Sequence, residues 1–150
     1  MRAASYARFG PAADVLEIGD IDTPAPGAGE VLVRLRWSGV NPSDAKARAG
    51  SRPGVTRPDH DRIIPHSDGA GVIEAVGEGV DADRIGQQVW IWNGQWKRAF
   101  GTAAEAIALP QDQAVPLPEG IDLETGATLG IPGLTACQTV FGGGPVDGQT

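Results

Sequence analysis

The chain has little cysteine, no long hydrophobic run and a deficit of basic residues, and each shortage excludes a class of protein. Cys137 is the only cysteine, so an internal disulfide is excluded and a reducing compartment is expected. No apolar run approaches the length of a membrane span, and the N-terminal "MRAASYARFG" lacks the hydrophobic segment of a signal peptide. Acidic residues number 19 against 12 basic ones, and the formal net charge of −7 argues against nucleic acid or an anionic membrane as a partner. We therefore expect a soluble, cytoplasmic protein.

Glycine and proline are abundant, at 22 and 12 of 150 residues, which predicts many turns and short strands rather than a helical bundle. The stretch "VLVRLRW" (31–37) alternates, so its apolar residues share one face of a half-buried strand and its arginines the other. That apolar face consists of Val31, Val33, Leu35 and Trp37. Further short strands are expected at 71–77, 88–92 and 104–109, with a loop rich in proline and glycine at 22–30. We expect a mainly β fold over residues 1–121, a partly open barrel.

The segment "WNGQW" (92–96) supports two predictions. Asn93-Gly94 between strand-like flanks is typical of a β-hairpin turn. Trp90 and Trp92 share a face by alternation, so both lie in the barrel core or both line a pocket for a flat substrate. The sequence does not distinguish these two alternatives.

One short helix is expected in "NPSDAKARAG" (41–50). Asn41 is a favourable N-cap residue, Pro42 suits the first helical position, and Asp44 falls in the electropositive first turn. Gly50 supplies the C-terminal stop. The four signals agree on where the helix begins and ends.

The composition changes after residue 121. "DLETGATLG" and "GLTACQTVF" are helix-like segments, broken by Ile131-Pro132-Gly133. The chain then closes with "GGGPVDGQT", a run of small and turn residues that normally leads into another element. We expect residues 122–150 to form a helical connection, and the chain to stop short of a further domain.

The glycine runs do not predict a phosphate-binding loop. "GEGVDA" (77–82) matches G-x-G-x-x-A after a strand, but only "DADRIGQ" separates it from the next strand, which leaves no room for a helix. We interpret it as a β-turn.

Metal and thiol chemistry are also weakly supported. "DHD" (59–61) and "HSD" (66–68) offer two histidines and three carboxylates, but there is no C-x-x-C pair, so a solvated surface loop is the better interpretation. Cys137 lies in an apolar helix-like stretch, where a buried small hydrophobe is more common than a reactive thiol.

Four segments in order resemble one known family. "SGVNPSDAKARAG", "IPHSDGAGVIEAVGEGV", "VWIWNGQW" and "GTAAEAIALP" are similar to the medium-chain dehydrogenase/reductase superfamily, closest to its zinc-free quinone oxidoreductase, or zeta-crystallin-like, branch. The resemblance implies a GroES-like barrel as the catalytic domain over residues 1–121. Residues 122–150 would then be the helical connection toward a Rossmann domain that binds NADPH and is absent from this chain.

The resemblance also explains "PHSDGAG" (65–71). Zinc alcohol dehydrogenases of the superfamily have a ligand cysteine where this chain has Asn41, and a ligand histidine where it has Ser67. His66 is one residue out of register with that ligand, and only Asp68 keeps the acidic character of its neighbour. The resemblance therefore implies no metal.

In the intact enzyme, the resemblance implies hydride transfer from NADPH to a quinone or another α,β-unsaturated carbonyl. A side chain or water would have to polarise the carbonyl in place of zinc. The implied site residues are Asn41 and Lys46 as catalytic groups, Asn41 and Thr135 for the cofactor, and Trp92, Asn93 and Trp96 for the substrate. Lys46 stands where several relatives have tyrosine. The fragment alone is expected to be inactive and to bind NADPH weakly.

The sequence leaves three alternatives open for the function and assembly of the chain. The chain could be a relative of zinc alcohol dehydrogenases, against which Asn41 and Ser67 argue, or a non-catalytic GroES-like binding or assembly module. A homodimer or an oligomer through the helical tail is also expected, because a missing domain would expose apolar residues there. Those residues are Leu129, Ile131, Leu134 and Val140.

Overall fold

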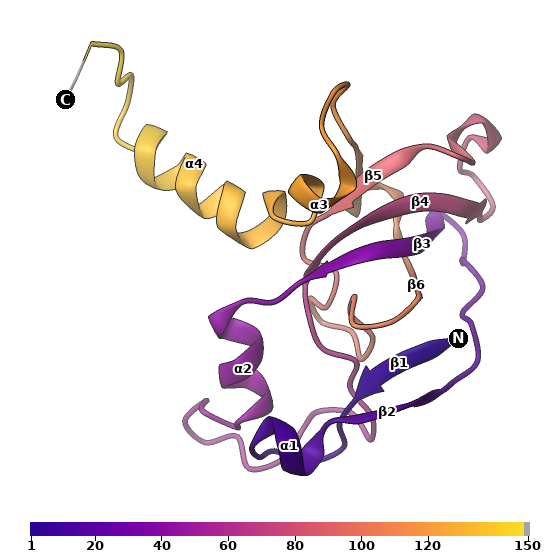
Figure 1. The fold of residues 1–150 in the computed structure, drawn as a ribbon, viewed down its shortest axis with the longest axis vertical. Coiled ribbons are helices and arrows are strands. Elements are labelled where there is room, and N and C mark those ends of the chain that lie inside the picture. Colours follow the sequence, from indigo (N-terminus) through magenta and orange to yellow (C-terminus); the bar gives the residue numbers. More distant parts are fainter. Residues whose placement is uncertain (149–150) are drawn as a thin grey trace.

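The structure is a computed structural model, and it describes residues 1–148. Its largest element is a five-stranded antiparallel sheet with strand order β6-β3-β4-β5-β7 (Figure 1). The strands are β3 (Glu30–Gly39), β4 (Asp68–Val76), β5 (Gln88–Ile91), β6 (Ala106–Pro110) and β7 (Ala114–Pro116). Each predicted strand between residues 31 and 109 is thus present.

A second, two-stranded sheet pairs β1 (Arg2–Ser5) with β2 (Glu17–Asp20) in antiparallel fashion. Isolated bridges connect this part of the chain to the rest, from Ala3 to Ala104 and from Tyr6 to Ile63. The two sheets do not close on each other. The predicted mainly β fold, a partly open barrel with a few short helices, is therefore confirmed.

The main hydrophobic core is formed by side chains from the strands of the large sheet. It is built from β-branched and leucine side chains, as expected for strands buried on one face. Its members are Val31, Val33, Ile73, Val89, Ile91, Ile107, Leu109 and Ala114. A smaller cluster of Tyr6, Val15 and Ile63 packs the N-terminal sheet and α1 (Ala12–Val15) against the loop before β4.

Trp37 does not follow the alternation predicted for β3. The register of β3 against β4 shifts between Leu35 and Trp37, and Trp37 is 48% exposed. An extra residue in one strand moves all later side chains to the other face. The prediction of Trp37 on the buried face was therefore wrong.

The prediction of a β-hairpin turn at Asn93-Gly94 was also wrong. After β5 the chain turns away, because both edges of β5 are already paired, with β4 on one side and β7 on the other. Asn93 adopts φ 51°, and the Gly94 N–H donates to the Ser67 carbonyl at 2.7 Å. The Asn-Gly pair makes a turn across the strand ends instead of a hairpin.

Two local predictions are confirmed. α2 (Pro42–Arg48) begins after Asn41, and Gly50 takes the left-handed conformation with φ 72° just beyond the helix. "GEGVDA" is a turn, in which the Val80 N–H donates to the Gly77 carbonyl, followed by the three-residue 3₁₀ helix η1 (Ala82–Arg84). A second 3₁₀ helix, η2 (Gln111–Gln113), separates β6 from β7.

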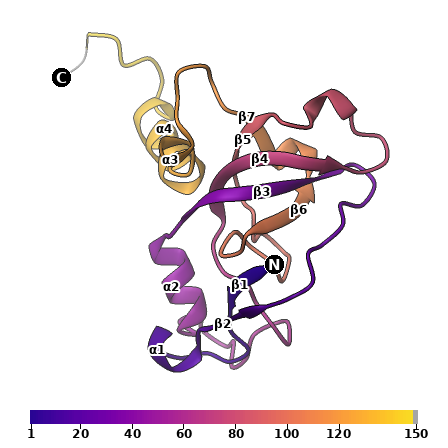
Figure 2. The ribbon, with the colours of Figure 1, turned by 45° about the vertical axis from the view of Figure 1, so that its right-hand side comes forward.

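The C-terminal region is helical and begins on the barrel. It consists of α3 (Leu123–Gly126), the π-helical segment η3 (Leu129–Gly133) and α4 (Leu134–Phe141). Figure 1 shows α4 extending away from the sheets, and Figure 2 shows α3 and α4 nearly end-on, beside the large sheet. None of the described helices is both long enough and apolar enough to span a bilayer.

The exposure of this region matches the predictions only in part. Leu134 and Val140 are exposed as expected, but Leu129 and Ile131 are half-buried. Cys137 is exposed, so its predicted role as a buried hydrophobe was wrong. The reason is that, among the described elements, α4 makes its main contacts with η3, the segment that it follows, and these leave the side chains of α4 uncovered.

Candidate active site

A buried carboxylate, Asp68, lies at the centre of the candidate site. Asp68 is the first residue of β4 and is 1% exposed. Its Oδ2 accepts a hydrogen bond from Asn41 Nδ2 at 2.7 Å, and both carboxylate oxygens lie 3.0 Å from the backbone nitrogen of Ile131. Burial raises the pKa of Asp68, and the hydrogen bonds from Asn41 and Ile131 oppose that rise because they stabilise the charged form. One carboxylate thus joins α2, β4 and η3.

The start of α2 fixes Asn41 through its backbone. The Asn41 N–H donates to Asp44 Oδ2 at 2.7 Å, and the Asp44 N–H donates to the Asn41 carbonyl at 3.0 Å. Pro42, with its restricted φ, occupies the first helical position. Because these hydrogen bonds of the Asn41 backbone define the helix start, the side-chain amide of Asn41 can donate its hydrogen bond to Asp68.

Gly130 allows η3 to approach Asp68 this closely. Gly130 has φ −62° and ψ −111°, a non-helical conformation inside η3. A Cβ atom on Gly130 would overlap the carboxylate of Asp68. Only glycine therefore permits the Ile131 N–H to reach this carboxylate without a shift of the backbone.

His66, in the loop before β4, begins a second hydrogen-bonded chain. His66 Nδ1 lies 2.9 Å from Ser38 Oγ, and Ser38 Oγ lies 3.0 Å from Thr102 Oγ1. Thr102 Oγ1 in turn donates to the backbone carbonyl of Asp68 at 2.6 Å. Burial lowers the pKa of His66, while the nearby carboxylates of Asp44 and Asp68 act in the opposite direction.

These positions correct one prediction from the sequence. The solvated loop is confirmed for residues 59–61, which are exposed. It was wrong for residues 66–68, because His66 is half-buried and Asp68 is fully buried in hydrogen-bonded networks. The sequence pattern of residues 65–71 does not reveal that β4 begins at Asp68. These polar residues were therefore expected to lie in a loop that faces water.

A cleft of about 520 Å³ opens beside this network. Its walls come from the N-terminal segment, α2, the loop at 52–60, the turn at 93–98 and Ile131. From α2 it is lined by Ser43, Asp44 and Ala47, and from the strand ends by Ser67 and Asn93. The volume suits a small organic ligand of two or three rings.

Only two of the three residues predicted to bind the substrate line the cleft. Asn93 and Trp96 line the cleft. Trp92 does not, because its indole N–H donates to the Asp112 carbonyl at 3.0 Å and its backbone is held by Gln113. Trp90 does not line the cleft either, and both tryptophans are half-buried and outside the buried core. Neither of the two alternatives drawn from their alternation is therefore correct.

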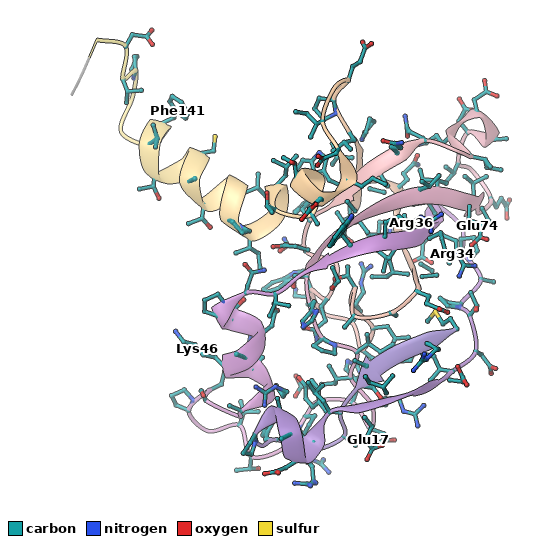
Figure 3. All side chains as sticks on the ribbon, viewed as in Figure 1. Glu17, Arg34, Arg36, Lys46, Glu74 and Phe141 are labelled. Atoms are coloured by element: carbon teal, nitrogen blue, oxygen red, sulfur yellow. The ribbon has the colours of Figure 1, made fainter. Side chains whose placement is uncertain are left out.

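The remaining predicted residues lie at different distances from the cleft. Asn41 is buried, one hydrogen bond away from Asp68 and next to the cleft-lining residues of α2. Lys46 is exposed, and Figure 3 shows it on the outer side of α2, pointing away from the sheets. Thr135 is exposed on the first turn of α4. Their roles in catalysis and cofactor binding stay predictions.

The side chains at the two zinc-ligand positions of the superfamily do not suit a metal ion, and the "GEGVDA" turn does not suit a pyrophosphate. Among residues 1–148, no three His, Cys, Asp or Glu side chains are grouped as ligands, and the two positions discussed above hold the neutral Asn41 and Ser67. "GEGVDA" is followed by a helix of only three residues, so it has no helix N-terminus able to hold a pyrophosphate.

The structure combines an open barrel, a capped helix after its longest strand, and a helical connection held by a buried carboxylate. Together these features define a GroES-like domain. Residues 27–119 match the family described as the alcohol dehydrogenase GroES-like domain, and the chain belongs to that family. Proteins named quinone oxidoreductase are among the relatives that the chain matches, which confirms the resemblance found in the sequence motifs.

Three of these relatives show the extent of the similarity. A quinone oxidoreductase of Rattus norvegicus is 37% identical over 142 residues, which is 94% of this chain and 41% of the rat protein. The crystal structure of a putative NADPH:quinone reductase from Bacillus thuringiensis gives a TM-score of 0.80 at 31% identity, covering 92% of this chain and 39% of that one. A mycobacterial protein solved in complex with NADPH gives 0.76 at 28% identity, covering 93% and 40%. The chain thus spans well under half the length of the proteins that it matches.

Proposed function

We propose that this chain is the substrate-side domain of an NADPH-dependent oxidoreductase that reduces quinones or enones without zinc. The observation that carries the proposal is the cleft beside Asp68, which is formed jointly by the barrel and by Ile131 of the connection. An acceptor bound in a cleft at that junction would lie where a following domain would meet the barrel. The similarity to quinone oxidoreductases supports the class of acceptor.

The cofactor would be held outside the described residues. When bound, NADPH supplies a hydride, and this chain binds and orients the acceptor. A structural relative was solved with NADPH, which supports this choice of cofactor. We accordingly assign residues 1–121 to the catalytic barrel and residues 122–150 to the connection, with the isolated chain inactive.

The chemistry of the donors supports zinc independence. Asn41 and Ser67 are neutral and bind Zn²⁺ poorly compared with thiolate and imidazole. The Asp68 carboxylate already accepts hydrogen bonds from Asn41 and Ile131. A zinc alcohol dehydrogenase is therefore the weaker alternative.

The residues in and beside the cleft have distinct roles in this proposal. Trp96 stacks on the acceptor ring, and Asn93 hydrogen-bonds to it at the inner end of the cleft. A single N–H of the Asn41 amide suffices for Asp68, and we assign the second N–H to the acceptor carbonyl. Asn41 is buried beside the cleft-lining Ser43 and Asp44, so the acceptor would approach it from that wall of the cleft. Thr135, on the first turn of α4, would face the cofactor. Lys46 would supply a proton only if its side chain turned around α2.

The test is NADPH oxidation by the longer protein that contains this chain, with 9,10-phenanthrenequinone as acceptor and after treatment with a chelator. We expect turnover that does not depend on zinc and that falls by about 100-fold in Asn41→Ala, the usual effect of losing one polarising donor. Lys46→Gln in the same assay tests the lysine as proton source. Activity that disappears on chelation and returns with zinc would contradict the proposal, as would a complete lack of quinone reduction.

A further inference from the structure

The cleft carries a local positive charge in an acidic chain. The formal net charge is −7, yet four of the chain's 12 basic residues line this one cleft. They are Arg52, Arg57, Lys97 and Arg98. Two carboxylates also line it, Asp44 and Asp59, so the formal balance of these six residues is +2 (4 − 2). A concave site with the opposite sign to the rest of the molecule attracts ligands of complementary charge.

None of the four cations forms an ion pair with a carboxylate within the described residues. The ion pair found there joins Arg34 to Glu74 at 2.9 Å, at the far end of β3 and β4 (Figure 3). Asp44 is buried and accepts the Asn41 N–H, so its carboxylate serves the start of α2. No ion pair among the described residues therefore neutralises the four cations, and the lining keeps its formal balance of +2.

Arg98 adds a donor that lacks a partner. Its Nη2 donates to Gln113 Oε1 at 2.6 Å, but its Nη1 is buried and has no hydrogen-bond partner in residues 1–148. Burial lowers the pKa of Arg98, which Glu30 opposes. An unpaired guanidinium donor costs free energy unless an acceptor reaches it, and an anionic oxygen is the best acceptor for it.

The rest of the lining is aromatic and apolar. Tyr6, Phe9 and Ile63 line the cleft on the side of the N-terminal sheet, and Trp96 lines it on the other side. The Lys97 ammonium lies 5.7 Å from the centre of the Trp96 ring, so ring and charge are presented together. Aromatic walls favour a planar ligand.

From these observations we propose that the acceptor is a planar quinone or enone that carries an anionic group, such as a carboxylate, sulfonate or phosphate. This inference rests on the proposed function and adds the charge of the substrate. The ring lies against Trp96, and the anionic group lies among Arg52, Arg57 and Lys97, with Arg98 in the same lining.

The test compares two quinones that differ in charge, anthraquinone-2-sulfonate and the neutral 2-(hydroxymethyl)anthraquinone. Each is titrated into the 150-residue chain, and binding is followed by quenching of tryptophan fluorescence, with free tryptophan as the correction for absorbance. At about 20 mM salt we expect the sulfonate to bind about tenfold more tightly. At about 0.5 M salt this preference falls to about twofold, because exposed charges are screened.

Two double variants with equal changes in net charge locate the effect. Arg52→Gln/Arg57→Gln removes two exposed cations from the cleft, and we expect it to reduce the preference for the sulfonate to about threefold or less. Arg2→Gln/Arg36→Gln removes two exposed cations from β1 and β3, away from the cleft, and the preference should stay near tenfold. An equal loss in both variants would show a nonspecific effect of net charge and overturn the proposal.

The outcomes also separate this inference from the function on which it rests. If both quinones bind with equal affinity, the cleft has no preference for an anion and the inference is overturned, while the quinone site stands. If neither binds, the proposed function itself is contradicted. A further titration adds NADPH to the chain saturated with sulfonate. If NADPH displaces the sulfonate, the cations serve the phosphates of the cofactor and the inference is overturned.

Discussion

Asn41 Nδ2 lies 2.7 Å from Asp68 Oδ2, and this contact connects the start of α2 to the first residue of β4. The same carboxylate receives the backbone N–H of Ile131, so the helical connection is attached to the barrel at this point. The position of one side of the cleft therefore depends on a single buried side chain.

Replacing Asp68 should destabilise the chain in a way that depends on the substituent. Asp68→Ala leaves the Asn41 amide and the Ile131 N–H buried without an acceptor, and we expect a loss of about 3 kcal/mol in the free energy of unfolding. Asp68→Asn keeps the size and one acceptor oxygen, and it should cost about 1 kcal/mol. Urea denaturation of both variants measures the difference. Equal losses would show that these hydrogen bonds contribute little.

Gly130→Ala should be among the most damaging glycine substitutions in the connection. The added methyl group would overlap the Asp68 carboxylate, so η3 must move away from β4, at a cost of about 2 kcal/mol. Gly143→Ala is the matched control, because a Cβ there has no neighbour within 4 Å. Thermal unfolding of the two variants gives the comparison. A Gly130→Ala protein as stable as Gly143→Ala would contradict the close packing of η3 on Asp68.

His66 should make stability fall as the solution becomes acidic. Its folded-state pKa is lowered, mainly by burial, so the unfolded chain binds the proton more readily than the folded one. The stability contributed by neutral His66 is present above its ordinary pKa of about 6.5 and is lost as the pH falls through that value toward the lowered one. The groups that face it are Ser38, Thr102, Asp44 and Asp68.

Urea midpoints at several pH values between about 7 and 5 measure this effect. His66→Asn should show a shallower fall in stability over this range, and asparagine tolerates the positive φ of 78° at this position. His60→Asn, in the exposed loop at 59–61, should keep the slope of the original chain. Identical slopes for His66→Asn and the original chain would exclude a role for His66.

The 150-residue chain should associate at high concentration through α4. Val140 and Phe141 are 50% and 58% exposed, on a helix that extends away from the barrel (Figure 3). Val140→Ser/Phe141→Ser removes this apolar surface and should lower the apparent mass in light scattering. An original chain that is monomeric at every concentration would contradict this expectation.

The sequence could predict elements whose signals are local. The start of α2 depends on contacts between Asn41, Pro42 and Asp44, which lie within four residues, and the strands follow from alternation. The bulge that exposes Trp37 depends on pairing with β4, and the failed hairpin depends on β7 occupying the edge of β5. Neither partner is visible in the segment itself.

The centre of the site was harder to predict for the same reason. Asp68 and Ile131 are 63 residues apart, and a backbone N–H leaves no mark in the sequence. Ser38, which lies 28 residues from His66, and Thr102, which lies on its other side in the sequence, have ordinary residue types for their strands and loops. The break at Ile131-Pro132-Gly133, directly after Gly130, was the one available signal, because it interrupts the helical pattern.

The most direct test of the account is a parallel titration of the 150-residue chain with neutral 2-(hydroxymethyl)anthraquinone and with NADPH. Trp96 lies in the cleft and reports quinone binding by quenching, while energy transfer from tryptophan to nicotinamide reports NADPH. A substrate-side domain should bind the quinone saturably and show no saturable binding of NADPH. Tight binding of NADPH without binding of the quinone would mean that these residues form a dinucleotide site, and it would contradict the account.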